Sequence, residues 1–314
     1  MDTVLYLAKL ALALVLGSGF SKLIGKERLL RTTAVGQTVL VWILLFFMGI
    51  NTGQIENIER ELATIGLSAL VLTLFSLAGS IIVALLGSKL FLPKEIDSSI
   101  AIARRKEGSL LRYGWDILKE PLFLVSIVVV GILFGVNSSL FGWFNSSYVT
   151  YLLYVMLFLV GMNLIQRSIS FGAVFRDPSI FLLPLYTILG TYLGAFGASL
   201  VTSFTFKEVA GMLSGFGWYS LSGILISDLG YPVLGSISFL SNLMRESFSF
   251  FLIPLFGRLG RRYYYPAASC GGATTMDVVL VLLSKNFGSA TMVGSIFHGS
   301  ALSLSAPLLI PLFF

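Results

Sequence analysis

The sequence has few charged residues, and this shortage excludes an ordinary soluble protein. Of its 314 residues, 11% are charged and 56% are hydrophobic, whereas a soluble domain has about 25% charged residues. A globule of this size cannot bury so much apolar surface, but a lipid bilayer can cover it. The sequence therefore predicts a membrane protein that leaves no room for a separate soluble domain of any size.

Cysteine is also nearly absent, and several catalytic motifs are missing. The single Cys270 excludes an intrachain disulfide and a cysteine-based metal cluster, and we expect no cofactor. Without a Gly-x-x-x-x-Gly-Lys-Ser/Thr loop, ATP-driven pumping within this chain is not predicted. The sequence also lacks Gly-x-Ser-x-Gly and His-Glu-x-x-His patterns. The net charge is +6, but its cations lie in short connections between apolar runs, which indicates membrane topology rather than nucleic-acid binding.

Eight apolar stretches are long enough to cross a bilayer, for which a helix needs about 20 residues. They are residues 4–23, 35–51, 62–90, 121–136, 149–163, 180–204, 233–256 and 291–313. Two more segments, 208–229 and 266–287, are interrupted by Gly, Ser and Thr. Irregular backbone at membrane depth is tolerated only beside protein or a wet cavity. The pattern predicts an all-α polytopic membrane protein with eight transmembrane helices, two re-entrant segments and inverted repeats.

Lys and Arg are concentrated in alternate connections, and this asymmetry predicts the orientation of the chain. The cations are Lys22, Lys26, Arg28 and Arg31 after the first span, Lys89, Lys94, Arg104, Arg105, Lys106, Arg112 and Lys119 around the third connection, and Arg167 and Arg176 after the fifth span. Because cationic connections stay in the cytoplasm, the N-terminus should lie outside. Segment 208–229 should then enter and return on the outer side, segment 266–287 on the inner side, and the C-terminus should also lie outside.

A short internal repeat predicts how the first six spans are related. Residues 44–51 align without gaps to residues 156–163, and each copy ends in Gly-x-Asn, at Gly49 and Asn51 or at Gly161 and Asn163. Units of three spans have opposite orientations, and inverted repeats are typical of secondary transporters. We expect repeat 1 at 4–90, a cytoplasmic linker at 91–118, repeat 2 at 119–206 and a transport region at 207–314. The alternative is a chance recurrence of Leu, Phe and Gly.

Four ionisable residues lie inside apolar segments, where a charge costs several kcal/mol and is a functional candidate: Arg245, Glu246, Asp277 and His298. Asn242 lies one helical turn before Glu246, so both should occupy the same helix face. The alternative is an Arg–Glu pair that only locks helices together, and a buried pair of this kind is weak evidence for stability.

The second interrupted segment offers a helix start close to Asp277. Gly271 and Gly272 loosen the chain, and Thr274 or Thr275 is a candidate N-cap for a half-helix that follows. The unpaired amides and positive dipole of such a start suit a carboxylate. The alternative is that Asp277 only stabilises the first turn of a solvated helix.

The remaining candidates have competing structural explanations. His298 is a candidate proton carrier, although a lone buried histidine is more often a hydrogen-bonded structural residue. Trp218 and Tyr219, with Ser220 beside them, can cover a cationic ligand through their ring faces, but aromatic residues at a membrane interface are the commoner case. Asn163 is expected to cap a span end or to line the repeat interface.

Four blocks of the sequence resemble the LysO-type lysine exporter family of prokaryotes: residues 214–225, 245–246, 270–277 and 298–299. The resemblance implies a multi-pass protein of the cytoplasmic membrane that exports L-lysine and its toxic analogues. It also implies that a membrane acidic pair, Glu246 and Asp277 here, matters for transport. Two outward termini agree with the family.

Lysine export needs an energy source, because an inside-negative potential of 100 mV retains a monovalent cation by about 2.3 kcal/mol. We therefore expect proton antiport, in which Glu246 or Asp277 exchanges a proton for lysine. Helix starts near residues 271–275 would take the lysine carboxylate. The alternatives are export of another solute, exchange of a metal ion, or an intramembrane enzyme that uses both carboxylates as an acid/base pair. The expected partners are L-lysine, protons and the lipid bilayer, and the sequence is compatible with a homo-oligomer.

Overall fold

The computed structural model describes the chain except for residues 1–2, 25–29, 56–57, 91–109, 137–146 and 167–178. All regular elements of the described residues are helical, as the sequence predicts. The long helices are α1 (Thr3–Ile24), α2 (Leu30–Gly53), α3 (Ile58–Leu90), α4 (Leu110–Val136), α5 (Ser147–Gln166), α7 (Ser179–Ser199), α10 (Pro232–Leu259) and α13 (Thr291–Leu309). The short helices are α8 (Phe206–Leu213), α9 (Tyr219–Asp228), α11 (Tyr264–Gly271) and α12 (Leu280–Phe287), with a 3-10 turn, η3, at Gly272–Met276.

The long helices have the lengths and apolar surfaces of a membrane protein. Four of them contain segments long and apolar enough to cross a bilayer: Thr32–Gly53, Ala63–Ser88, Ile180–Ser199 and Thr291–Leu312. Two shorter apolar segments are Leu122–Val136 and Tyr148–Asn163. Many large apolar side chains on these helices are exposed, such as Leu67 of α3 and Leu189 of α7, and lipid rather than water suits such a surface.

Glycine allows the long helices to pack in close pairs. A Cβ atom on Gly49 of α2 would overlap the Val128 carbonyl of α4, and one on Gly161 of α5 would overlap the Leu14 carbonyl of α1. Small residues at such contacts are typical of helix packing in membranes. The two glycines of the internal repeat thus make the same kind of contact, α2 with α4 and α5 with α1.

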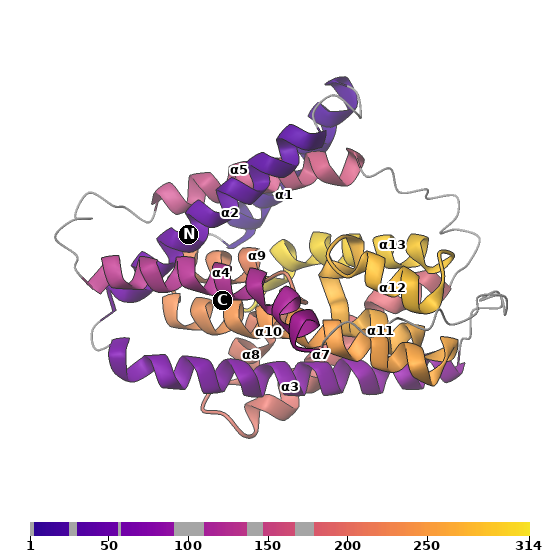
Figure 1. Ribbon diagram of the computed structural model, residues 1–314. Coiled ribbons are helices and arrows are strands. Elements are labelled where there is room, and N and C mark those ends of the chain that lie inside the picture. The colour runs from indigo at the N-terminus through magenta and orange to yellow at the C-terminus, as the bar shows by residue number, and fades with distance from the viewer. Residues whose placement is uncertain (1–2, 25–29, 56–57, 91–109, 137–146, 167–178) are drawn as a thin grey trace.

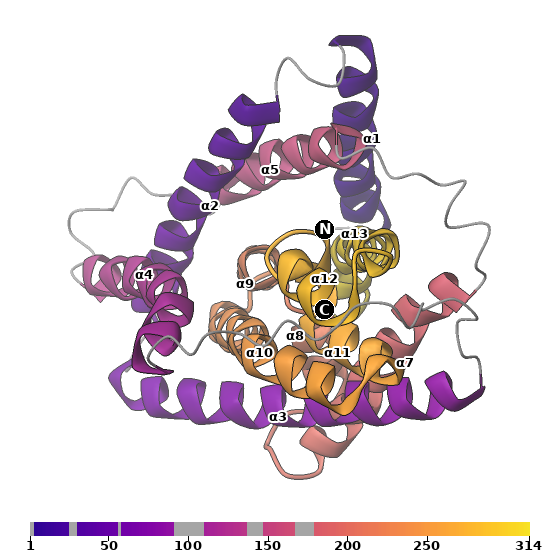
Figure 2. The same cartoon turned by 45° about the vertical axis from the view of Figure 1, so that its right-hand side comes forward.

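The helices form two groups (Figure 2). We call α1, α2, α4 and α5 the frame helices, and α3 together with α7 to α13 the hairpin bundle. The two chain termini lie at one end of the molecule, the terminus end, because Tyr6 contacts Asp228 and Phe314 contacts Tyr231. The start of α2 and the end of α5 lie at the opposite end, where Gln37 contacts Asn163.

Two short hairpins enter the bundle from opposite ends (Figure 1). In hairpin A, α8 runs antiparallel to α7, since Phe206 packs on Phe196 and Ser214 bonds Tyr192. Helix α9 then returns antiparallel to α10, so both open ends of hairpin A lie at the terminus end. In hairpin B, α11 runs inward and α12 returns, which brings Phe287 against Tyr264 at the opposite end.

Several boundaries differ from the expected ones. Helix α3 begins at Ile58 and α4 at Leu110, before the apolar runs predicted at 62 and 121, and α7 ends at Ser199 rather than at 204. In α3 and α4 the residues before the apolar run are helical as well, because helical backbone hydrogen bonds do not require apolar side chains. Most of the expected linker 91–118 lies outside the described residues. So do the predicted cytoplasmic cations Lys26, Arg28, Lys94, Arg104, Arg105, Lys106, Arg167 and Arg176.

Candidate functional site

The bends of the two hairpins meet inside the hairpin bundle. In hairpin A the backbone turns at Phe216 (φ 50°) and Gly217 (φ 99°), and in hairpin B it turns at Gly272 (φ 59°). The Ala273 amide donates a hydrogen bond of 2.8 Å to the Phe216 carbonyl. A Cβ on Gly272 would overlap this carbonyl. Direct contact between the two backbones therefore requires glycine here.

Asn242 of α10 holds the bend of hairpin A in place. Its Oδ1 accepts a hydrogen bond from the Gly217 amide at 2.7 Å, and its Nδ2 donates to the Met212 carbonyl at 3.0 Å. Ser238, one turn earlier, also donates to the Met212 carbonyl, at 2.7 Å. These bonds satisfy backbone groups that the bend frees from helical pairing, so Asn242 fixes the shape of the bend.

Arg245 supports hairpin B from behind and is 1% exposed. Its guanidinium donates to the Ser269 carbonyl at 2.7 Å and to the Cys270 carbonyl at 3.3 Å, at the end of α11. It also donates to hydroxyls of α3 and α7, on Ser80 and Thr191, both at 3.1 Å. A cation suits the carboxyl end of a helix. The described hydrogen bonds of Arg245 thus go to carbonyls and hydroxyls, and Arg245 joins three helices.

His298 of α13 lies in a hydroxyl network and is fully buried. Its Nδ1 lies 2.9 Å from Thr275 Oγ1, and its Nε2 lies 2.9 Å from Thr187 Oγ1. The Thr187 hydroxyl also bonds Ser269 at 2.9 Å. The histidine therefore connects α13 with α7 and with the bend of hairpin B, in agreement with the structural alternative.

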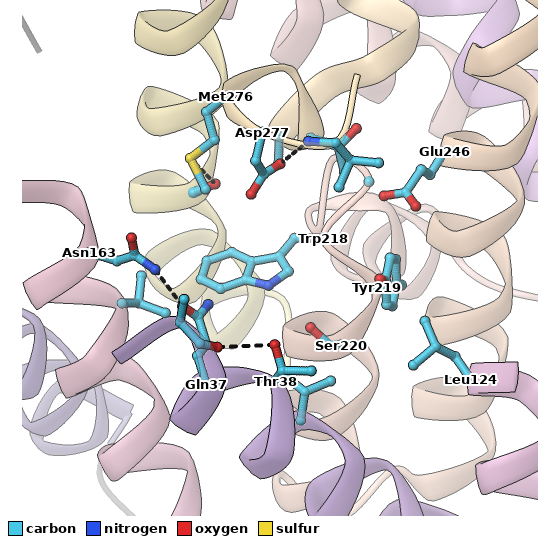
Figure 3. Close-up of a pocket in the computed structure, with 18 of the residues that line it drawn as sticks. Gln37, Thr38, Leu124, Asn163, Trp218, Tyr219, Ser220, Glu246, Met276 and Asp277 are labelled. Carbon is cyan, nitrogen blue, oxygen red and sulfur yellow. Dashed lines mark hydrogen bonds between the residues drawn. The ribbon is translucent and has the colours of Figure 1, made fainter. Parts of the chain in front are cut away.

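A pocket of about 260 Å³ lies between the frame helices and the two bends (Figure 3). Its volume is close to the lower limit of ligand pockets, about 300 Å³, and suits a small solute. Its wall consists of Ala34, Gln37, Thr38, Val41 and Trp42 of α2, Leu124 of α4, Val160 and Asn163 of α5, Gly217, Trp218, Tyr219 and Ser220 of hairpin A, Glu246 of α10, Ala273, Thr274, Met276, Asp277 and Val278 of hairpin B, and Ser303 of α13.

The pocket is acidic. Glu246 and Asp277 both line it, and Figure 3 shows their carboxylates approaching the same space, with the indole ring of Trp218 beside it. Glu246 is 4% exposed, while Asp277 is partly exposed and accepts a hydrogen bond of 2.7 Å from the Val278 amide. Among the described residues, the pocket wall has no Lys or Arg. This pocket therefore attracts cations.

The amino end of α9 supplies the opposite polarity. Helix α9 begins at Tyr219 beside the pocket, and no side chain of the described residues caps it. Because the first amides of a helix have no acceptor within it, they and the helix dipole favour an anionic group. Ser220 adds a hydroxyl in the same part of the wall.

The expected cap at the second bend is wrong. Thr274 and Thr275 donate their hydroxyls to the carbonyls of Gly271 and Gly272, at 2.9 and 2.8 Å. Helix α12 begins only at Leu280, without a side-chain cap. The threonines close a 3-10 turn instead, because a hydroxyl near its own backbone can donate to a carbonyl three residues earlier.

The structure divides the predicted site residues into two sets. Six of them line the pocket: Trp218, Tyr219, Ser220, Glu246, Thr274 and Asp277. The other six lie behind it and shape or support the bends: Asn242, Arg245, Gly271, Gly272, Thr275 and His298. Sequence reasoning missed Gln37 and Thr38 of α2. Gln37 accepts a hydrogen bond of 2.8 Å from Asn163, and its polarity within an apolar helix was the available signal.

Comparison with known proteins identifies the family. The family model described as "Lysine exporter LysO" matches residues 125–314, more than half of the chain. The chain belongs to the lysine exporter LysO family. It is 30% identical over 282 residues to the "Lysine exporter LysO" of Escherichia coli (strain K12), covering 87% of this chain and 88% of that protein.

A second relative is the "Putative lysine exporter" of Haemophilus influenzae (strain ATCC 51907 / DSM 11121 / KW20 / Rd). The two sequences are 31% identical over 190 residues, which cover 60% of this chain and 96% of the relative. The resemblance inferred from the sequence motifs is therefore confirmed. The protein is a membrane protein of a lysine exporter family, and the family name indicates transport.

Proposed function

We propose that the protein exports L-lysine from the cytoplasm by proton antiport. The observation that carries the proposal is the pocket at the meeting point of the two bends, which has two carboxylates and, in its described wall, no Lys or Arg. Lysine has a net charge of +1, with two ammonium groups and one carboxylate. The names of both relatives support lysine as the solute.

The pocket offers a partner for each charged group of lysine. The ammonium groups bind Glu246 and Asp277, and the lysine carboxylate binds the amino end of α9 beside Ser220. This assignment replaces the expected carboxylate seat at residues 271–275, since the Val279 and Leu280 amides bond the carbonyls of Thr274 and Asp277. Trp218 lies along the aliphatic stem, where an aromatic face is attractive to hydrocarbon and cation alike.

We further propose that eight helices cross the bilayer and that the two hairpins are re-entrant. To the four helices with the longest apolar segments we add α1, α4, α5 and α10; the apolar segments of α4 and α5 are shorter within the described residues. Hairpin A opens outward with both chain termini, and hairpin B opens to the cytoplasm. The matched glycine contacts, α2 with α4 and α5 with α1, support inverted repeats at 4–90 and 119–206.

Proton antiport solves the energetic problem of expelling a cation. One proton exchanged for one lysine moves no net charge, so the membrane potential does not oppose the exchange. A buried carboxyl is protonated more readily than an exposed one. A proton therefore replaces lysine on Glu246 or Asp277 during the return step. The pocket thus has the same net charge when it holds the proton as when it holds lysine.

Transport into proteoliposomes tests the proposal. Proteoliposomes that hold the protein in the inside-out orientation and have an acidic lumen should accumulate labelled lysine against its gradient. Collapse of the pH difference should abolish this accumulation. Glu246→Gln and Asp277→Asn should each abolish uphill transport. Glu208→Gln is the matched control, since Glu208 caps α8 away from the pocket and glutamine preserves such a cap.

Competition separates this proposal from a carrier for another solute. Excess unlabelled lysine should suppress counterflow of labelled lysine, whereas norleucine, which lacks the side-chain ammonium group, should not. Uphill lysine transport by both carboxylate variants would contradict the coupling mechanism. Full counterflow of norleucine without counterflow of lysine would contradict the substrate.

A further inference from the structure

Asp228 joins the hairpin bundle to the frame helices at the terminus end. Its Oδ2 accepts a hydrogen bond of 2.6 Å from the Tyr6 hydroxyl of α1. Its Oδ1 accepts one of 2.5 Å from the Thr150 hydroxyl of α5. A third hydrogen bond between the two groups, Thr52 to Ser236 at 2.8 Å, lies at the same end.

The position of Asp228 is unfavourable for α9 itself. Asp228 is the last residue of α9, where a negative charge meets the negative end of the helix dipole. Tyr6, its partner, is 1% exposed. Because the Asp228 carboxylate accepts hydrogen bonds from hydroxyls of two other helices, it stabilises the contact of α9 with α1 and α5 rather than α9 itself.

The contact between the two groups is tight at this end and open at the other. Met48 of α2 is fully buried, and a Cβ atom on Gly223 of α9 would lie only 2.9 Å from its sulfur. On the other side of the bends the pocket separates α2 from hairpin B. A solute in the pocket therefore leaves by the terminus end only after α9 moves away from α1, α2 and α5.

The internal repeat relates the two sides. The alignment of residues 44–51 with 156–163, continued without gaps, pairs Thr38 with Thr150. Thr38 lines the pocket, whereas Thr150 bonds Asp228 in the closed contact. One threonine of the pair thus faces the open side while its counterpart faces the closed side.

We propose that Asp228 is a positioning residue of the transport cycle, whose hydrogen bonds to Tyr6 and Thr150 close the terminus end while the pocket is open at the other end. This inference rests on the proposed function. The two bonds break each time lysine is released, and they re-form when the pocket faces the cytoplasm again. Their strength sets the balance between the two forms.

Cysteine accessibility measures this balance directly. Met48→Cys, in a Cys270→Ala background, reports opening of the terminus end by its rate of reaction with a membrane-impermeant maleimide. Tyr6→Phe and Thr150→Val should each raise this rate about tenfold, and lysine affinity from the pocket side should fall in parallel. The matched controls are Tyr264→Phe and Thr202→Val, whose hydroxyls bond within the bundle, and they should leave the rate unchanged.

A merely structural role would lower thermal stability without changing the Met48→Cys rate. That result, or equal rates in the Tyr6 and Thr150 variants and their controls, would overturn the inference. The labelling needs no lysine, so its outcome stands apart from the proposed function. If the unaltered protein does not transport lysine but Tyr6→Phe and Thr150→Val still raise the labelling rate, the result counts against lysine as the substrate and supports the role of Asp228 in closing the terminus end.

Discussion

Gly272 decides whether the two bends can touch. Its φ of 59° combines with a ψ of −128°, a conformation that costs other residues about 1–3 kcal/mol, and a Cβ there would overlap the Phe216 carbonyl. Both effects act on one residue. The local geometry of the pocket wall therefore depends on the absence of a single methyl group.

Gly272→Ala should lower the free energy of unfolding by at least about 2 kcal/mol and abolish lysine binding, because the bends must separate. Gly230→Ala is the matched control, since Gly230 also has a positive φ, 99°, but has no atom within 4 Å of a Cβ. It should lose only about 1–2 kcal/mol and keep binding. Thermal melting in detergent checks both, and equal losses would contradict the account.

The residues that carry charge were predictable, and some of their neighbours were not. Glu246 and Asp277 interrupt apolar sequence, where charge is expensive, so they were identified without a structure. Gln37 and Thr38 lie in a helix more than 200 positions away in the sequence, and only packing brings them to the same wall. Asn242 was identified as a ligand candidate, but its described bonds hold a bend instead.

At the scale of the elements, Arg245 connects α10 with three other helices. It joins α3, α7 and the end of α11 through four hydrogen bonds. Hydrogen bonds to charged groups contribute about 1.5–3 kcal/mol each. Lysine has one ammonium group and cannot reproduce the planar fork of a guanidinium.

Arg245→Lys should therefore lower the free energy of unfolding by at least about 3 kcal/mol, although the charge is kept. The exposed Arg258 in the last turn of α10 provides the matched control, and Arg258→Lys should change stability by less than about 0.5 kcal/mol. Chemical unfolding monitored by tryptophan fluorescence measures both. A stable Arg245→Lys protein would show that the guanidinium bonds do not hold the hairpin.

The positions of the helix breaks followed from sequence, but their internal bonding did not. Runs of Gly, Ser and Thr marked both bends correctly, because such residues free the backbone. The start of α12 was misplaced, since a threonine hydroxyl can either cap a following helix or donate to a preceding carbonyl. Only the surrounding packing decides between these two uses.

On the scale of the whole molecule, the apolar stretches predicted helices that can cross a membrane, and the described residues include four helices long and apolar enough to do so. The count of eight spans, the repeat boundaries and the sidedness remain predictions. The structure shows that Tyr6 and Phe314 both lie at the terminus end. Sequence could not establish this relation without an assumption about every crossing between them.

Both termini should be accessible from the same, outer face of the membrane. Short protease-cleavable tags at residues 1 and 314 should both be cut in intact cells after the outer layers are permeabilised, and neither should be cut from the cytoplasmic face. The reason is that the two termini share one end of the molecule, while Lys22 in the last turn of α1 and Arg258 in the last turn of α10 lie toward the other end. Cleavage of the two tags from opposite faces would contradict the arrangement.

Binding of labelled L-lysine to the purified protein tests the central claim most directly. The account predicts saturable binding to the unaltered protein and to Glu208→Gln. It predicts at least about tenfold weaker binding to Glu246→Gln and to Asp277→Asn, which corresponds to about 1.4 kcal/mol for each lost charge partner. Binding of lysine to both carboxylate variants as tightly as to the unaltered protein would contradict the account.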